Sequence, residues 1–180
     1  AANIREYEQI DIWNVNNGVT NASLLDGFTL TNAAGTNQGA IYNDGASPLF
    51  RHLFIAANNT NGLYNTNGTP TLIDVLISSN TPRGMYQYGG TTTFINSTIA
   101  GNNSVAANIA LGSVTLNNSL LCGPNAGNIT SNHSVVTNDP GLISNLFNDY
   151  SGGDYSLNYF GPAVNAGDNT LYPNLYLDTK

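Results

Sequence analysis

Three consecutive stretches of the sequence decide the fold: AIYNDGASPLFRHLFIAANN from Ala40, GLYNTNGTPTLIDVLISSN from Gly62 and GMYQYGGTTTFINSTIAGNN from Gly84. They superpose without gaps, so similar residues fall into columns. The two main apolar columns are Phe50, Leu72, Phe94, Leu116 and Ile55, Ile77, Ile99, Leu121. The sequence is therefore an internal repeat with a period of about 22 residues, and this period constrains the architecture.

A repeat of this length favours a β-solenoid over the alternatives. Helical repeats are longer, about 33 to 47 residues, and need helix formers. This chain is instead rich in Asn, Gly and Thr, which disfavour helices. The LxxLxLxxN motif of leucine-rich repeats does not recur. Short apolar and β-branched runs separated by Asn and Gly are typical of strands and turns. We predict an all-β, right-handed parallel β-helix of about five coils, each about 4.8 Å high.

The repeat also divides the chain. A fourth copy runs roughly from Ala106 to Gly127. An earlier copy from Ala22 matches Leu25 to Phe50 at a slightly longer offset, which places a short insertion near residues 35–38. We expect coils over residues 21–130 and an N-terminal strand, cap or end of a preceding coil over residues 1–20. We expect a terminating coil and an irregular tail, truncated at Lys180, over residues 131–180.

The columns predict ladders inside the coil. Asn58, Asn80 and Asn102 form a column in which side-chain amides would hydrogen-bond along the stack. A column of small residues, Ala56, Ser78, Ala100 and Cys122, marks an interior position too tight for a large side chain. Cys122 is then expected to be a buried, unreactive thiol.

Composition excludes several classes of function. Only four residues are basic, the formal net charge is −7, and charged residues make up 8% of the chain. Nucleic-acid binding and attachment to an anionic membrane both need basic surfaces, so neither is expected. No apolar run is long enough to insert into a membrane. One cysteine excludes a disulfide scaffold and a cysteine zinc site within the chain.

The segments NASLLDGFTLTN from Asn21, DPGLI from Asp139 and GDYSLNYFGPAVNAGDN from Gly153 carry a resemblance. Together with the repeats they resemble bacterial secreted or cell-surface parallel β-helix repeat proteins, over roughly residues 21–169. Many of those proteins are large and carry C-terminal anchoring or sorting domains. The resemblance implies an extracellular or cell-surface location and an adhesive or scaffolding role, and it supplies no catalytic residues.

Residues for catalysis are sparse. Lyase chemistry needs a basic residue, and the internal candidates are Arg51, expected to point outward, and Arg83, expected in a turn. A glycosidase needs two facing carboxylates. The nearest arrangement to a site is His52 above Asp74, in a column of polar bend residues that turn chemistry alone explains. No enzyme activity and no cofactor is expected. Calcium is an open alternative, with Asp149, Asp154 and Asp168 in Gly-rich turns as weak candidate ligands.

Two further sets of residues are candidate binding faces. Tyr42, Tyr64 and Tyr86 would stack in a row, which suits sugar rings or a protein partner if it points outward, and an inward core ladder is the favoured reading. The second set is a hydroxyl array, similar to that of ice-binding solenoids. Its two columns are Ser47, Thr69, Thr91, Ser113 and, on the same face, Thr71, Thr93, Thr115.

These observations favour a non-catalytic structural or adhesive module of a larger surface protein. Its partners would be other domains or subunits of a surface assembly, or surface glycans. A glycan-binding module, a polysaccharide-active enzyme and an ice-binding solenoid stay open as alternatives, and the direction of the tyrosine and threonine side chains distinguishes them.

Overall fold

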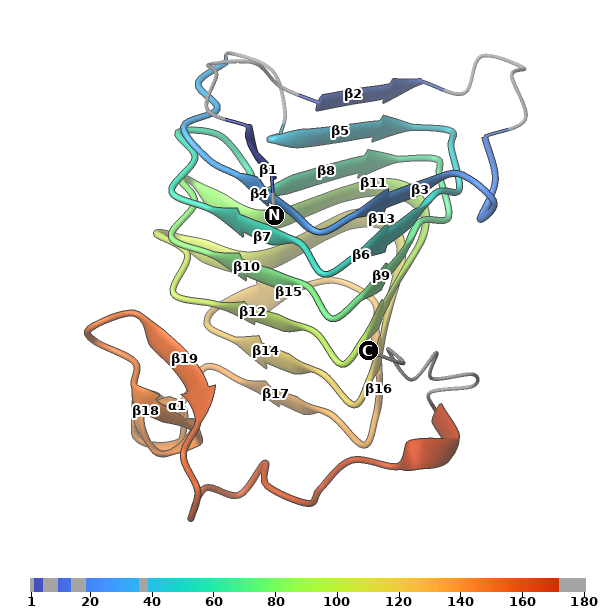
Figure 1. Ribbon diagram of the computed structural model, residues 1–180. Helices are drawn as coiled ribbons and strands as arrows, with labels where there is room; N and C mark the ends of the chain where they lie inside the picture. The colour runs from blue at the N-terminus through green and yellow to red at the C-terminus, as the bar shows by residue number, and fades with distance from the viewer. Residues whose placement is uncertain (1, 5–9, 14–18, 36–38, 172–180) are drawn as a thin grey trace.

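The chain forms a parallel β-solenoid of about five turns, as predicted from the sequence repeat (Figure 1). The computed structural model describes residues 2–4, 10–13, 19–35 and 39–171. Each turn contributes short strands to three faces, which we call faces A, B and C. Every strand pairs in parallel with the corresponding strand of the neighbouring turn, so the apolar columns of the sequence become continuous ladders.

Face A is a seven-stranded sheet. Its strands are β1 (Ala2–Ile4), β4 (Phe28–Leu30), β7 (Phe54–Ala56), β10 (Leu76–Ser78), β12 (Thr98–Ala100), β14 (Leu120–Cys122) and β17 (Val135–Thr137).

Faces B and C are joined by two long strands that run across both, β11 (Arg83–Ile95) and β13 (Val105–Asn117). The other strands of face B are β2 (Ile10–Trp13), β5 (Ile41–Asp44), β8 (Leu63–Thr66) and β15 (Asn125–Ala126). Those of face C are β3 (Leu24–Asp26), β6 (Leu49–Arg51), β9 (Thr71–Ile73) and β16 (Ile129–Asn132).

The core lies inside the coil and matches the predicted apolar columns. Phe50 pairs with Leu72 and Leu72 with Phe94, while Ile55 pairs with Ile77. All of these side chains are fully buried. The earlier copy keeps the longer offset predicted for it, because Leu25 pairs with Phe50 and Leu30 with Ile55. The insertion expected near residues 35–38 falls mostly outside the described residues.

The corner between faces C and A explains the column of polar bend residues. His52, Asp74, Asn96, Asn118 and His133 all have positive φ angles, between 45° and 55°. Asn, Asp and His tolerate this left-handed conformation better than other side chains. The column therefore serves first to turn the backbone. We call this row of side chains the corner column.

Buried amides form two ladders, of which one was predicted. In the predicted ladder Asn58 Nδ2 donates to Asn80 Oδ1 (2.8 Å), and Asn80 Nδ2 donates to Asn102 Oδ1 (3.0 Å). A second ladder lies behind face B. There Asn43 Nδ2 donates to Asn65 Oδ1 (2.6 Å), and Asn65 Nδ2 donates to Gln87 Oε1 (3.2 Å). The sequence analysis missed this second ladder.

After the last turn the chain folds back over face A. The returning segment contains α1 (Pro140–Leu146), an antiparallel hairpin of β18 (Phe147–Asp149) and β19 (Asp154–Leu157), and the short 3-10 helix η1 (Asn169–Leu171). The Asp139 carboxylate caps α1 by accepting from Gly141 N–H (2.8 Å). Helix and hairpin replace much of the irregular tail expected over residues 131–180, and Figure 1 shows them beside the lower strands of face A.

This C-terminal packing corrects the prediction for the small-residue column. Ile99 and Leu121 point into the core, so their neighbours Ala100 and Cys122 point outward from face A. These outward residues are nevertheless buried, because Ile143, Leu146 and Phe147 cover them in a second apolar cluster. Cys122 is therefore buried as expected, but beneath the helix and hairpin rather than inside the coil.

At the N-terminal end, β1 and β2 pair in parallel with β4 and β5 and so continue the stack. Within the described part of the chain, no helix is long and apolar enough to cross a membrane.

Candidate functional site

The tyrosine row points outward from face B, so the favoured prediction of an inward ladder is wrong. In β5 and β8 the buried residues alternate with partly exposed ones, and Tyr42 and Tyr64 belong to the exposed set. Their neighbours Ile41 and Leu63 fill the core instead. Tyr86 occupies the same position in β11, in register with Tyr64. The three rings form an outward aromatic row, which we call the tyrosine strip.

Neighbouring rings of the strip are in contact. The ring centroids of Tyr42 and Tyr64 lie 5.5 Å apart, and those of Tyr64 and Tyr86 lie 4.9 Å apart. The rings are tilted by 47° and 33°, so each leaves an edge and part of a face uncovered. Arg83 was expected in a turn but is the first residue of β11. Its guanidinium lies 5.4 Å from the Tyr86 ring centroid, within the range of a cation–π contact. Tyr88 extends the strip and is 47% exposed.

The close packing of the tyrosine strip shifts the pKa of its central residue, Tyr64. Burial, and then the neighbouring Tyr86, Tyr42 and Tyr88, raise the pKa of Tyr64 above its ordinary value of 10.0. Like an ordinary tyrosine, Tyr64 is protonated at neutral pH, and its hydroxyl group can both donate and accept hydrogen bonds.

The hydroxyl array lies on the outer side of face C. Thr71, Thr93 and Thr115 alternate with buried core residues and are partly exposed, in one register through the stack. In the second column, Ser47 Oγ lies 2.6 Å from Thr69 Oγ1, and Thr91 Oγ1 lies 3.0 Å from Ser113 Oγ. Hydroxyl groups in that column thus bond partly to one another along the stack.

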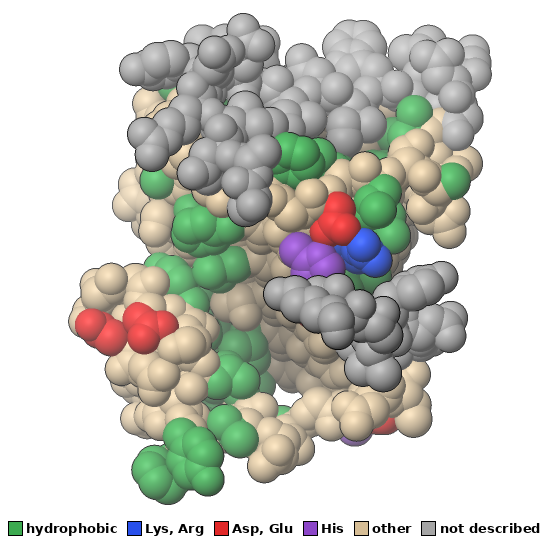
Figure 2. Space-filling view, in the orientation of Figure 1, with side chains coloured by type: hydrophobic (Ala, Val, Ile, Leu, Met, Phe, Trp, Pro, Cys, Tyr) green, Lys and Arg blue, Asp and Glu red, His purple; other side chains and the backbone are tan. Residues whose placement is uncertain are grey.

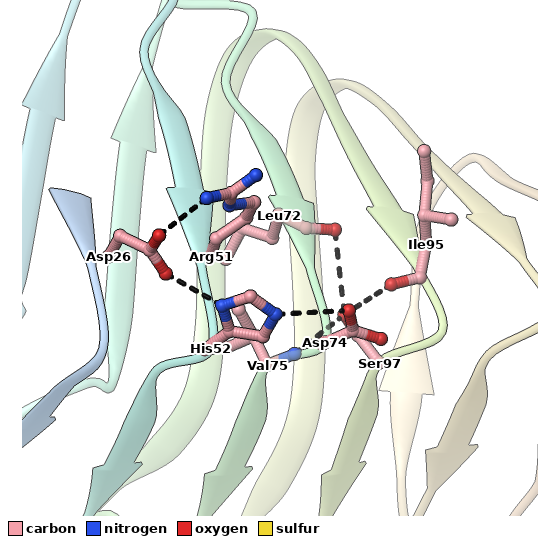
Figure 3. A network of polar contacts seen from close by, with 8 residues as sticks. All are labelled: Asp26, Arg51, His52, Leu72, Asp74, Val75, Ile95 and Ser97. Carbon is pink, nitrogen blue, oxygen red and sulfur yellow. Dashed lines mark hydrogen bonds and ion pairs between the residues drawn. The ribbon is translucent and has the colours of Figure 1, made fainter. Parts of the chain in front are cut away.

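An ionic network joins face C to the corner column (Figure 3). Asp26 Oδ2 accepts from Arg51 Nη2 (2.6 Å), and Asp26 Oδ1 lies 2.7 Å from His52 Nδ1. His52 Nε2 lies 3.6 Å from Asp74 Oδ2. The sequence analysis placed His52 and Asp74 in one column but missed Asp26. The signal was present, since the same offset that pairs Leu25 with Phe50 also pairs Asp26 with Arg51.

The chemistry of this network favours charge neutralisation. Burial alone would raise the pKa of Asp26, but hydrogen bonds and charges from Arg51 and His52 outweigh it and hold the pKa below 3.8. Asp26 is thus an ionised carboxylate that pairs with Arg51 and His52, rather than a general acid. Arg51 points outward, as expected. Within the described residues, no group of three or more His, Cys, Asp or Glu side chains could hold a metal ion.

Two of the three candidate calcium ligands, Asp149 and Asp154, flank the turn of the β18–β19 hairpin, and the third, Asp168, lies in the C-terminal segment. Hydrogen bonds lower the pKa of each carboxyl: from Gly152 N–H and Ser151 to Asp149, from Ser156 to Asp154, and from Thr170 to Asp168. Asp149 and Asp154 face each other across the hairpin, while Asp168 lies against the corner column. The structure therefore brings two of the three together, and their oxygens already accept bonds from the turn residues.

A groove separates the corner column from the C-terminal segment. The groove has a volume of about 450 Å³ and is open to solvent. The solenoid lines it with residues 96–98, residues 118–120, His133 and Val135. The C-terminal segment lines it with residues 155–157 of β19 and with Ala163, Ala166 and Gly167. Asn118 spans the lower part of this groove, because its side chain bonds to both the N–H and the C=O of Asp168 (2.8 Å each).

Figure 2 shows how few charged side chains this side of the molecule presents. One small group of acidic, basic and histidine side chains lies near the middle of the view, and an acidic group lies on the C-terminal hairpin. A few histidine and acidic atoms are also visible, partly covered, at the lower edge. Uncharged polar and apolar groups make up most of the remaining described surface in this view. Comparison of the chain with models of known families, with curated proteins and with solved structures finds no match.

Proposed function

We propose that this chain is a non-catalytic structural and adhesive module of a larger secreted or cell-surface bacterial protein. The resemblance of its repeats and C-terminal motifs to surface β-helix proteins supports the location. The architecture supports the role, because solenoid turns contact only their neighbours and make rigid, extendable surfaces. Two buried amide ladders add to this rigidity, since each rung is hydrogen-bonded to the next.

The single observation that carries the adhesive role is the outward direction of the tyrosine strip. Tyrosine combines an apolar ring with a polar hydroxyl group, which is why it is enriched on surfaces that bind partners. A row of identical residues at the spacing of the turns suits a ligand that also repeats, such as a polysaccharide. Arg83 and Tyr88, next to Tyr86, supply further polar groups that could bind the hydroxyl groups of the polysaccharide. A surface glycan is therefore the ligand we favour.

The arrangement of ionisable groups favours binding over catalysis. A catalytic site needs groups that converge on one substrate position. Among the described residues, Asp26 is engaged by Arg51 and His52, and Asp149, Asp154 and Asp168 accept bonds within their own turns. Arg83 contacts an aromatic ring on another face.

The test is a glycan array probed with the full chain and with two variants. Tyr64→Ala removes the central ring of the strip, whereas Tyr159→Ala removes a 78% exposed tyrosine of the C-terminal segment and serves as the matched control. We expect the wild type and Tyr159→Ala to bind the same glycans and Tyr64→Ala to lose at least tenfold in affinity, since truncation of a central aromatic anchor costs about 2 kcal/mol or more. Binding to no glycan, or equal binding by all three proteins, would refute the adhesive role of the strip.

The outward hydroxyl array favours ice binding as a second candidate. Thr71, Thr93 and Thr115 form a straight, partly exposed column on face C. The discriminating measurement is thermal hysteresis of the wild type and of Thr93→Tyr, whose bulky ring interrupts the column. Activity in the wild type that is lost in the variant would favour this candidate over the glycan-binding face.

A further inference from the structure

The groove beside the corner column contains one asparagine side chain, that of Asn96, to which no other described residue is hydrogen-bonded. Asn96, Ser97 and Thr98 line the groove together with residues of the next solenoid turns, of β19 and of the segment 163–167. A volume of about 450 Å³ lies within the range of ligand-binding cavities. The lining mixes amide and hydroxyl groups with apolar side chains, among them Leu157, which is 43% exposed.

Asn118 shows what this corner can bind. Its Oδ1 accepts from the backbone N–H of Asp168 at 2.8 Å, and its Nδ2 donates to the backbone C=O of the same residue at 2.8 Å. One asparagine thereby satisfies both backbone polar groups of a single residue. Gly167 lies against the Asn118 side chain, so the segment approaches closely.

Asn96 occupies the equivalent backbone position in the preceding turn. Asn96 and Asn118 occupy neighbouring places in the corner column and have the same φ angle of 49°. Asn96 is exposed, it lines the groove, and its side-chain amide makes no hydrogen bond within the described residues. Asn118 uses its side-chain amide to bind the chain's own backbone, whereas the equivalent amide of Asn96 is available to bind a ligand.

We propose that Asn96 binds a residue of an extended peptide from a partner protein, with Oδ1 accepting its N–H and Nδ2 donating to its C=O. The peptide lies in the groove above residues 163–167 and beside β19. Two observations favour a peptide over other amide-bearing ligands. Asn118 already holds a peptide backbone, and β19 has β18 as its only strand partner in the described chain, so it can accept an added strand.

The experiment follows binding of a synthetic peptide to the full chain by two-dimensional amide NMR and by fluorescence anisotropy. The peptide has the sequence AVNAGDN of residues 163–169, whose Gly-Asp pair fits the geometry at Asn118. A second peptide carries an N-methyl group on the aspartate nitrogen and cannot donate that hydrogen bond. The variant Asn96→Gly removes the amide and keeps the left-handed backbone. Asn32→Gly, an exposed left-handed asparagine elsewhere, is the matched control.

We expect the peptide to shift resonances of residues 96–98 and of β19 in the wild type and in Asn32→Gly. Asn96→Gly and the N-methyl peptide should each weaken binding about tenfold, as expected from the loss of one or two hydrogen bonds. Asn118→Gly should still bind. If binding is lost in Asn118→Gly and kept in Asn96→Gly, the peptide only exchanges with the chain's own segment, and the proposal fails. It also fails if the wild type binds no peptide.

Discussion

Asn58 and Asn80 stand one above the other inside the coil, with Asn58 Nδ2 2.8 Å from Asn80 Oδ1. Asn80 also donates to the carbonyl of Ile55 (3.0 Å) and accepts from the backbone N–H of Asn58 (3.2 Å). Each asparagine thus connects one turn to the next through both its side chain and its backbone. The ladder satisfies polar groups where the chain leaves face A.

This ladder gives the first prediction. Asn80→Ala removes a partner from the buried Asn58 N–H and from the Ile55 carbonyl, and it leaves Asn58 Nδ2 with the Leu30 carbonyl as its remaining acceptor. We therefore expect a loss of about 2–4 kcal/mol in the free energy of unfolding. Asn59→Ala, which changes an exposed neighbour, should stay within about 0.5 kcal/mol of the wild type. Urea denaturation followed by circular dichroism measures both. Equal stability of the two variants would show that the ladder contributes nothing.

The second prediction concerns acid stability and Asp26. Its folded pKa is held below 3.8, so the ionised carboxylate stabilises the fold. That contribution is complete above the pKa of the unfolded chain and is lost as the pH falls through the lower, folded value. We expect Asp26→Asn to flatten the loss of stability between about pH 5 and pH 3. The effect should be about 1 kcal/mol or less, since these side chains are roughly one-third exposed and solvent screens them.

Urea denaturation at a series of pH values tests this. Arg51→Gln removes the partner that donates to Asp26 and should flatten the same part of the curve. A pH dependence that is identical in wild type and Asp26→Asn would exclude the network as a source of acid sensitivity.

The sequence predicted the register of the coil because its inward residues are apolar and recur at a fixed period. It misplaced the tyrosines because the usual rule, apolar inside and polar outside, is reversed beside them. Asn43 and Asn65 point inward and Tyr42 and Tyr64 outward. Amides are tolerated inside a coil because each finds its partner one turn away. The alternation Ile-Tyr-Asn was the available signal, since residues two apart share a face of a strand.

Features that depend on the C-terminal segment were harder to predict. The direction of Cys122 follows from strand alternation, but nothing in the repeat indicates which face α1 covers. The contact between Asn118 and Asp168 joins residues 50 positions apart, outside any period of the sequence. The groove next to this contact therefore could not be predicted from the columns of the repeat.

The third prediction uses the buried thiol. Burial beneath α1 and the hairpin raises the pKa of Cys122 to about 12, so the reactive thiolate is scarce at neutral pH. We expect negligible reaction with a thiol reagent in the folded protein and one equivalent after denaturation in guanidinium. Ile143→Ala, which thins the cover, should accelerate the native reaction. Rapid labelling of the folded wild type would mean that the helix does not cover face A in solution.

The last prediction concerns the corner between faces B and C, where Gly68, Gly90 and Gly112 stack. Gly90 has a φ angle of +72°, and a Cβ atom built there would collide with the carbonyl oxygen of Gly68. Neither atom can move without separating the turns, because Thr91 N–H donates to that same carbonyl at 3.1 Å. Gly90→Ala therefore adds a backbone clash to the left-handed strain, and we expect a loss of about 3 kcal/mol or more.

Gly153→Ala separates these two contributions. Gly153 has a similar φ angle of +83°, but a Cβ atom there meets nothing within 4 Å. Gly153→Ala should therefore lose only the stability that the left-handed backbone conformation costs a residue with a Cβ atom, about 1–2 kcal/mol. Thermal unfolding of both variants measures the difference, which we attribute to the close approach of neighbouring turns. If both variants lose the same stability, backbone conformation alone requires glycine at this corner, and the tight stacking of the turns does not.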